Sequence, residues 1–208
     1  MKYKNLTVSQ KGLSLIESAM VLAISAVVVS GVLYYYNQAQ ENRKLEEGIK
    51  QIQTIAASVN KLYTNSTASI RGASTDEETN KIIEAISAIS GIPTKKLTNG
   101  KAKVFTTPSG QWVQFWVNKK GPGNNTYSLE TQVQSVSSCI SYATLNMGTI
   151  MAAKTKVVVD QTEYPNGGTS NSSTNFSLSP SVASDACKQA YDANNGKNNI
   201  KIRYTLSY

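Results

Sequence analysis

The longest pattern in the chain is an apolar stretch near the N-terminus that changes character halfway along. From Ser18 to Gln40 the residues are uncharged, and as a helix they would extend about 35 Å, enough to cross a hydrocarbon core of about 30 Å. Further on, apolar residues recur every three or four positions, at Ile49, Ile52, Ile55, Ala56, Val59 and Leu62. This spacing is typical of a helix with one apolar face. The pattern predicts one helix from Leu13 to about Tyr63, apolar all round first and amphipathic afterwards.

After this helix, a polar stretch precedes a second helical pattern. Ser74 together with Asp76–Glu78 predicts a capping box for a helix that runs through Lys81 to Ser90. Gly91 and the proline two residues later would end it. We therefore expect a short helix between the long helix and the first strands.

Runs rich in β-forming residues predict an antiparallel sheet in the second half of the chain. Gln111–Asn118 and Tyr127–Val136 indicate a hairpin, and Thr155–Gln161 indicates a further strand. Residues 199–208 alternate apolar and polar side chains, which is typical of a half-buried strand. A sheet packed against the long helix gives an α+β fold.

Three aromatic residues fall close together in the first strand of this hairpin. Trp112, Phe115 and Trp116 are expected to pack on the long helix as part of the core. The alternative is an exposed aromatic site for a sugar or a partner protein.

Composition narrows the class of protein. A chain of 208 residues has room for one globular domain beside the N-terminal segment. It has no histidine, which removes the commonest general base and metal ligand. The sequence also lacks paired functional carboxylates and a glycine-rich phosphate loop, so we expect no enzymatic activity and no cofactor. The rival class is a membrane-anchored periplasmic enzyme or binding module.

Charge is uneven along the chain. The formal charge is +8, and Lys2, Lys4 and Lys11 precede the apolar stretch with no acid before Glu17. This asymmetry places the N-terminus in the cytoplasm, with the three tyrosines that begin at Tyr34 at the far interface. Glu17 itself is unusual, because a carboxylate near the middle of a bilayer costs about 2.5–3.5 kcal/mol and so calls for a partner. A position among the lipid headgroups is the simpler alternative.

The two cysteines lie on expected helices. Cys139 falls in a helical run from Ser138 to Asn146, and Cys187 follows the helix start at Ser179-Pro180. An even cysteine count in an exported chain favours one disulfide, and two buried thiols are the alternative. A disulfide across this interval would stabilise the fold by about 4 kcal/mol on the chain-entropy model.

The residues around the start of the long helix resemble a known signature. Lys11-Gly12 followed by Leu-Ser-Leu-Ile-Glu is similar to the type IV prepilin signature, and residues 12–36 resemble the start of the bundlin family of type IVb pilins. Shorter similarities occur at Cys139–Thr149 and Ser179–Lys188. The chain lacks the proline that the type IVa helix carries partway along, and residues 63–138 show no family motif.

The resemblance implies a type IV pilin fold in three parts. Residues 1–12 would be a cleaved leader. Residues 13–63 would be the N-terminal helix, of which 13–40 anchor the chain in the membrane and polymerise, and 64–208 would be the globular head. Cys139 and Cys187 would bound the D-region, with Asn166–Asn175 exposed on the fibre.

The resemblance also implies roles for three N-terminal residues. A prepilin peptidase would cut between Gly12 and Leu13 and methylate the new amine of Leu13. Glu17, fifth in the mature chain, would pair with the N-terminal amine of a neighbouring subunit. The implied function is the major structural subunit of a type IVb pilus, a homo-oligomeric filament used in adhesion, aggregation or conjugation. The alternative is a minor pilin or pseudopilin of a secretion or conjugation machine.

The resemblance finally implies a route through the cell. The chain would be held in the inner membrane of a Gram-negative bacterium, handed to a pilus assembly platform and carried outside in the fibre. One further feature concerns nucleic acid. Lysines 95, 96, 101, 103, 119 and 120 form a basic cluster that either attracts DNA and anionic surfaces or is simply a solvated face.

Overall fold

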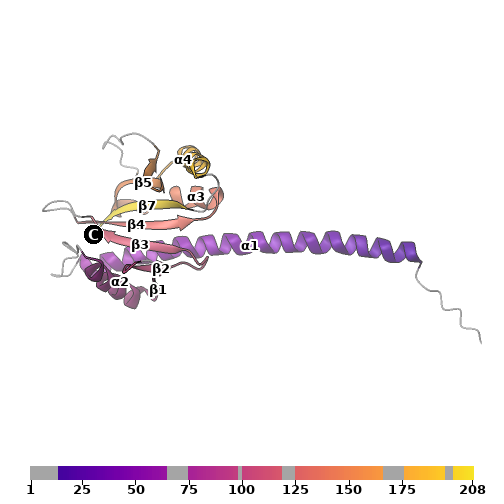
Figure 1. The fold of residues 1–208 in the computed structure, drawn as a ribbon, viewed down its shortest axis with the longest axis horizontal. Coiled ribbons are helices and arrows are strands. Elements are labelled where there is room, and N and C mark those ends of the chain that lie inside the picture. The colour runs from indigo at the N-terminus through magenta and orange to yellow at the C-terminus, as the bar shows by residue number, and fades with distance from the viewer. Residues whose placement is uncertain (1–13, 65–74, 98–99, 119–124, 166–175, 195–198) are drawn as a thin grey trace, which may run out of the picture. The chain divides into compact units, whose positions relative to one another are not determined.

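The computed structural model describes residues 14–64, 75–97, 100–118, 125–165, 176–194 and 199–208. The α-helices in these ranges are α1 (Leu15–Tyr63), α2 (Asp76–Ser90), α3 (Val136–Ala143) and α4 (Pro180–Ala193), with a 3-10 turn at Gly148–Ile150 (Figure 1). The strands are β1 (Thr94–Lys96), β2 (Lys103–Thr106), β3 (Trp112–Val117), β4 (Thr126–Val133), β5 (Met151–Val159), β6 (Thr162–Tyr164) and β7 (Ile200–Ser207). The chain divides into two compact units between Arg43 and Lys44, so α1 contributes to both.

The strands form one antiparallel sheet of seven in the order β1-β2-β3-β4-β7-β5-β6. The last strand, β7, lies between β4 and β5 and pairs with β4 from Val133↔Ile200 to Thr126↔Ser207. Its side chains alternate strictly between buried and half-buried, which confirms the strand expected at the C-terminus. Strand β7 therefore joins the two halves of the sheet.

The second part of α1 supplies the centre of the core on one face of this sheet. Ile52, Ile55, Ala56 and Val59 are buried with the inward side chains of the strands, and Ile49 and Leu62 pack at the margin. This is the expected apolar stripe, so the amphipathic part of the helix prediction is confirmed. The helix start expected at Leu13 lies outside the described residues. Within them, α1 begins at Leu15.

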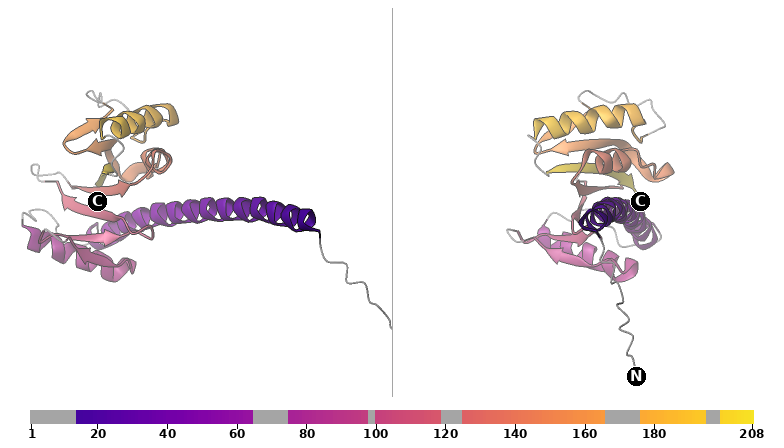
Figure 2. Two further views of the ribbon diagram at one scale, coloured as in Figure 1. Left: turned by 45° about the vertical axis from the view of Figure 1, so that its right-hand side comes forward. Right: turned by 90° about the vertical axis from the view of Figure 1, so that its right-hand side faces the viewer.

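The other helices cover the same face of the sheet. Residues of α2, α3 and α4 belong to the same buried cluster as α1, and Figure 2 shows α2 beside β1 and β2 with α3 and α4 near β5 and β7. The opposite face carries no described helix. The expected α+β fold, with a long helix against an antiparallel sheet, is confirmed.

The start of α2 differs by one residue from its prediction. The N-cap is Thr75, whose hydroxyl accepts a hydrogen bond from the Glu78 amide at 3.2 Å while the Glu78 carboxylate accepts one from the Thr75 amide. The Ser74 capping box was wrong because Glu78 lies three residues after Thr75, the spacing a capping box requires. Gly91 ends α2 in the left-handed conformation, as expected.

Other boundaries differ where turn residues intervene. The strand expected to reach Val136 ends at Val133, because Ser135 caps α3. The strand expected over Thr155–Gln161 instead begins at Met151 and ends before Asp160, which has positive φ. The helix expected to begin at Ser138 starts at Val136, whereas Ser179 and Pro180 begin α4 as predicted.

Candidate functional site

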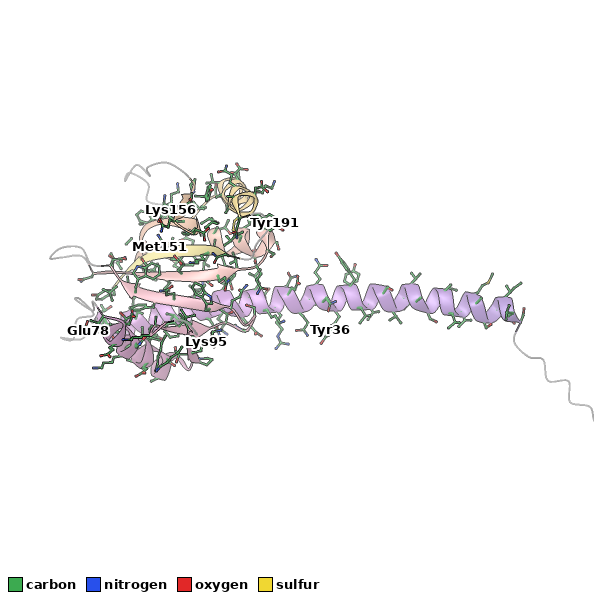
Figure 3. The ribbon with its side chains drawn as sticks, in the orientation of Figure 1. Tyr36, Glu78, Lys95, Met151, Lys156 and Tyr191 are labelled. Atoms are coloured by element: carbon green, nitrogen blue, oxygen red, sulfur yellow. A yellow bond between two sulfur atoms is a disulfide. The ribbon has the colours of Figure 1, made fainter. Side chains whose placement is uncertain are left out.

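The first part of α1 exposes an apolar surface that its own chain leaves uncovered. Between Leu15 and Tyr36 every large apolar side chain is at least 55% exposed, including the labelled Tyr36 (Figure 3). Within the described residues α1 is the one helix long and apolar enough to cross a membrane. Such a surface is unstable in water and requires an apolar environment.

The serine hydroxyls in this segment are satisfied by the helix itself. The hydroxyls of Ser18, Ser25 and Ser30 donate to the carbonyls of Leu15, Val21 and Ala26 at 2.9, 2.7 and 2.7 Å, and these are all the serines from Leu15 to Gln40. These bonds matter because an apolar medium offers no water to replace them. The serines can therefore enter an apolar environment at little cost, which leaves the carboxylate in the first turn as the charged group of the segment.

That carboxylate belongs to Glu17, in the first turn of α1. Its Oε2 accepts a hydrogen bond from the amide of Ser14 at 3.3 Å. Helical side chains tilt toward the N-terminus, which brings the carboxylate to the start of the helix and to its positive dipole end. Gly12 and Leu13, where cleavage and methylation are expected, lie outside the described residues.

A disulfide joins α3 and α4. Cys139 of α3 and Cys187 of α4 are bonded, with their Cα atoms 6.0 Å apart, and both are fully buried. The alternative of two buried thiols is therefore wrong for this structure. Asn166–Asn175, expected to be exposed within this interval, lie outside the described residues.

The helix that carries Cys139 docks on α1 through Tyr142. A side-chain carbon at Gly48 would overlap the hydroxyl of Tyr142, so glycine is what lets the ring lie against α1. The hydroxyl of Tyr204 donates to the Tyr142 carbonyl at 2.6 Å and ties α3 to β7. Burial raises the pKa of Tyr142 to about 12, and it raises the pKa of Tyr204 well above its usual value, with a smaller contribution from Tyr142. Both tyrosines are thus held neutral inside the head.

An ion cluster occupies the sheet face that has no described helix. The carboxylate of Glu130 lies 2.9 Å from the Arg203 guanidinium and 3.3 Å from the Lys201 ammonium, and its side chain is only 5% exposed. Arg203 also pairs with Glu163. A buried carboxylate persists only when it is paired and hydrogen-bonded, and two cations meet that need here.

The tryptophans belong to this cluster rather than to the core. Trp112 and Trp116 are half-buried, whereas Val113, Phe115 and Val117 point inward. Lys201 lies 5.5 Å from the ring centre of Trp112 and the Arg203 guanidinium 5.4 Å from that of Trp116. The expectation that all three aromatic residues pack on α1 was wrong for both tryptophans. Side chains alternate across a strand, and Trp112 and Trp116 lie three positions before and one position after the inward Phe115, so they point to the opposite face.

Part of the expected lysine cluster is organised around a carboxylate. Lys103 pairs with Glu84 of α2, and Asn80 fixes the adjacent turn by accepting from the Lys103 amide at 2.7 Å and donating to the Lys101 carbonyl at 2.8 Å. The hydrogen bond from Lys103 lowers the pKa of Glu84 most, followed by the charge of Lys103. Lysines 119 and 120 lie outside the described residues.

Two open grooves flank the exposed side of α1 within the head. One, of about 420 Å³, separates α1 from the end of α2 and is lined by Lys50, Gln53, Thr54, Ala57, Ser58, Lys61, Ile89 and Ser90. The other, of about 360 Å³, separates α1 from the loop after α3. Among the residues that the structure describes, no group of three or more histidine, cysteine, aspartate or glutamate side chains is placed to hold a metal.

Comparisons with known proteins agree on one family. The Bundlin family model matches residues 37–207. The chain is 32% identical over 193 residues to the major structural subunit of bundle-forming pilus from Escherichia coli O111:H-, covering 89% of this chain and 91% of that protein. The corresponding protein of Escherichia coli O127:H6 (strain E2348/69 / EPEC) gives the same identity and coverage.

A solved structure has a similar fold. The crystal structure of a type IV b pilin from Salmonella typhi superposes with a TM-score of 0.52 and 14% sequence identity, covering 77% of this chain and 98% of that one. At this identity the similarity concerns the fold alone. It agrees with the arrangement of a long helix against an antiparallel sheet described above.

Proposed function

The chain belongs to the bundlin family, and from this premise we propose that it is the major structural subunit of a type IVb pilus. The observation that carries the proposal is the exposed apolar surface between Leu15 and Tyr36, which continues into a helix packed in a folded head. Both curated relatives are named as major structural subunits of bundle-forming pilus. Their names favour this function over that of a minor pilin or pseudopilin.

The apolar part of α1 has two uses in this proposal. Before assembly it holds the subunit in the inner membrane, with the N-terminus in the cytoplasm and the head in the periplasm. During assembly on a platform of membrane proteins, the same surface leaves the lipid and packs against its copies in neighbouring subunits. Apolar burial favours either surrounding over water, so the segment exchanges one apolar partner for another.

Processing precedes assembly. Residues 1–12 form the leader, and a prepilin peptidase cuts between Gly12 and Leu13 and methylates the Leu13 amine. Glycine suits the cleavage position because it lacks a side chain that would hinder a close approach by the protease. The mature chain then consists of the helix over 13–63, whose residues 13–40 anchor and polymerise, and the head over 64–208, with its D-region between Cys139 and Cys187.

Glu17 sets the register between subunits. In the mature chain its carboxylate pairs with the N-terminal amine of a neighbouring subunit, in a helix bundle that excludes water. An unpaired charge in such a bundle is costly, by about 3–5 kcal/mol when one partner of a buried pair is removed. The contact between Glu17 and the Ser14 amide supports this role, because the carboxylate already points toward the start of the helix.

Electron microscopy of fibres sheared from cells that express the chain tests the proposal. N-terminal sequencing of their main protein should begin at Leu13, and Gly12→Val should leave only the unprocessed form in the membrane. Absence of fibres, or fibres that contain this chain only as a trace component, would refute the proposed function. A processed band in the Gly12→Val variant would refute the cleavage position alone.

A further inference from the structure

The exposed apolar segment of α1 ends in a belt of polar side chains. We call residues 34–40 the tyrosine–amide belt, because three tyrosines are followed there by three amide side chains. The tyrosines are between 60% and 76% exposed, and Tyr36 marks the place of the belt along the helix (Figure 3). Asn37 and Gln38 are exposed as well. The belt therefore presents hydroxyl and amide groups to whatever surrounds the helix.

One hydroxyl of the belt has a partner in its own helix. The side-chain amide of Gln40 donates to the hydroxyl of Tyr36 at 3.0 Å, across one helical turn. The hydroxyls of Tyr34 and Tyr35 form no hydrogen bond within the described chain. Their rings meet edge to face, with centres 6.3 Å apart. The amide–hydroxyl pair is thus a combination that the belt already uses, and two hydroxyls are left over.

These two hydroxyls change surroundings when the subunit assembles. At the membrane interface, water and lipid headgroups can satisfy a tyrosine hydroxyl while its ring lies in the apolar layer. In the proposed fibre the same surface packs against neighbouring copies, and water is excluded. A hydroxyl that is buried without a partner costs free energy. The belt therefore needs a hydrogen-bonding group from a neighbouring copy.

The proposed pairing of Glu17 with the amine of Leu13 sets the register between two copies. In parallel helices it brings each residue of one copy level with the residue four positions earlier in its neighbour. The shift amounts to about 6 Å along the helix axis. Ala39 of one copy is then level with Tyr35 of the neighbour, and Gln38 lies about 1.5 Å along the axis from that level. The register therefore brings the belts of the two copies together.

Helical rotation decides which belt residues face each other. Each residue turns the helix by about 100°, so Gln38 lies about −60° from the direction of Glu17. In the neighbouring copy, Tyr35 lies about +40° from the direction of Leu13. Because the helices face each other, these opposite signs bring both side chains to the same side of the contact. By the same count, Asn37 points about 160° away from it.

The distance between the helices suits these two side chains. Packed helices lie about 8–10 Å apart, and glutamine and tyrosine are long enough to meet across that gap. We propose that in the fibre the side-chain amide of Gln38 donates a hydrogen bond to the Tyr35 hydroxyl of a second copy of this chain. The inference rests on the proposed function, since it uses the register that Glu17 sets.

This bond gives the fibre a second fixed point. Apolar packing is non-directional, so it does not by itself hold two helices in one register. A hydrogen bond has a preferred distance and angle. The bond from Gln38 lies about 32 Å along the helix from Glu17, at the other end of the apolar segment. The two polar contacts together hold the apolar surfaces between them in register.

Paired substitutions test the bond with the full chain. Tyr35→Phe leaves the amide of Gln38 unpaired, and Gln38→Leu leaves the hydroxyl unpaired. Each should make purified fibres dissociate in mild detergent by about tenfold faster. The double variant Tyr35→Phe/Gln38→Leu should regain most of the loss, because no polar group is then buried alone. Asn37→Leu is the matched control and should dissociate like the wild type, and immunoblots should show equal amounts of processed subunit in the membrane for all four.

Cross-linking measures the contact directly. Tyr35→Cys and Gln38→Cys are expressed together as two separate chains, and their mixed fibres are treated with a short thiol cross-linker. Since Cys139 and Cys187 are bonded to each other, a linked dimer can arise only between the added cysteines of two copies. Fibres of either chain alone should give much less dimer, as should Tyr35→Cys expressed with Asn37→Cys.

The outcomes separate this inference from the function on which it rests. Single variants as stable as the wild type, a double variant that dissociates faster than either, or mixed fibres without the dimer would overturn the bond. Loss of fibres in the single variants that is reversed in the double variant would support it, whereas loss in all three would overturn it. Failure of these tests with wild-type fibres present would refute this inference only, and absence of wild-type fibres would refute the proposed function itself.

Discussion

The two parts of α1 share one helical backbone and differ in what surrounds their side chains. Between Leu15 and Tyr36 the large apolar side chains are exposed, whereas Ile52, Ile55 and Val59 are fully buried by the sheet and the other helices of the head. The first part is apolar all round and the second has one apolar stripe. The second part therefore finds its partner in its own chain.

The difference shows where each part obtains its stability. Burying a large apolar side chain is worth about 1.5–3 kcal/mol, and the second part gains this when the head folds. The first part gains it only from a membrane or from other subunits. Variants in the first part should therefore affect assembly, and variants in the second part should affect folding of the head.

The largest expected effect is on assembly and comes from Glu17→Gln. The variant should insert in the membrane, be processed and keep a folded head, because the carboxylate contacts only the Ser14 amide within the described chain. It should form no fibres, since the amine of a neighbouring subunit would be left without its charged partner. Electron microscopy of shear fractions, with immunoblots of the membrane fraction, measures both outcomes.

The next acid along the same helix provides the control. Glu41 is exposed and follows the apolar segment, so Glu41→Gln should leave fibre number and length unchanged. Fibres of normal number and length from Glu17→Gln would contradict the pairing. They would leave the division between the two parts of α1 intact.

The next effect concerns the head and comes from removing the disulfide. Replacing Cys139 and Cys187 with alanine should lower the free energy of unfolding by about 4 kcal/mol, because the unfolded chain loses the constraint of a 48-residue separation. Denaturant titration of the detergent-solubilised full chain measures this loss. Reduction of the wild type should give a similar value, and membrane insertion should be unaffected. A loss below about 1 kcal/mol would show that α3 and α4 are held mainly by packing.

Glycines in the two parts of α1 make a matched pair for a third prediction. In Gly48→Ala the overlap with Tyr142 should cost about 1–3 kcal/mol, and the better helix propensity of alanine should return about 1 kcal/mol. The expected net loss in the free energy of unfolding is therefore up to about 2 kcal/mol. A side-chain carbon at Gly31 would meet no atom within 4 Å, so Gly31→Ala should leave the unfolding of the head unchanged. Denaturant titration of the two variants measures the difference.

The overlap at Gly48 can be relieved from the other side. Adding Tyr142→Phe removes the hydroxyl, and the double variant should recover part of the stability lost in Gly48→Ala. A double-mutant cycle on free energies of unfolding isolates this coupling. A coupling energy near zero in this cycle would show that α3 is not docked through this contact.

Much of this arrangement could be predicted from local sequence patterns. The stripe through Ile52, Ile55 and Val59 gave the buried face of α1, and the alternation after Asn199 gave β7. Ser179-Pro180 gave the start of α4. In each case the signal is local, because helix and strand periods and cap residues act within a few positions.

Features that depend on pairing between distant segments could not be predicted in this way. The place of β7 between β4 and β5 follows from strand pairing, and the need for glycine at position 48 follows from where Tyr142 docks. Prediction of the ion cluster around Glu130 would likewise require knowledge of which strands pair. One local signal was overlooked, since alternation along Gln111–Asn118 already separates Trp112 and Trp116 from Phe115.

The smallest expected effect tests the position of the α2 cap, which local sequence left ambiguous by one residue. Thr75→Ala should lower the free energy of unfolding of the head by about 1 kcal/mol, because it removes the acceptor for the Glu78 amide. Ser74→Ala is the control and should change it by less than about 0.5 kcal/mol, the usual range for a surface substitution away from such features. Equal losses in both variants would mean that the two hydroxyls share the capping role. A loss in Ser74→Ala alone would restore the cap predicted from sequence, and neither variant should alter membrane insertion, which depends on the first part of α1.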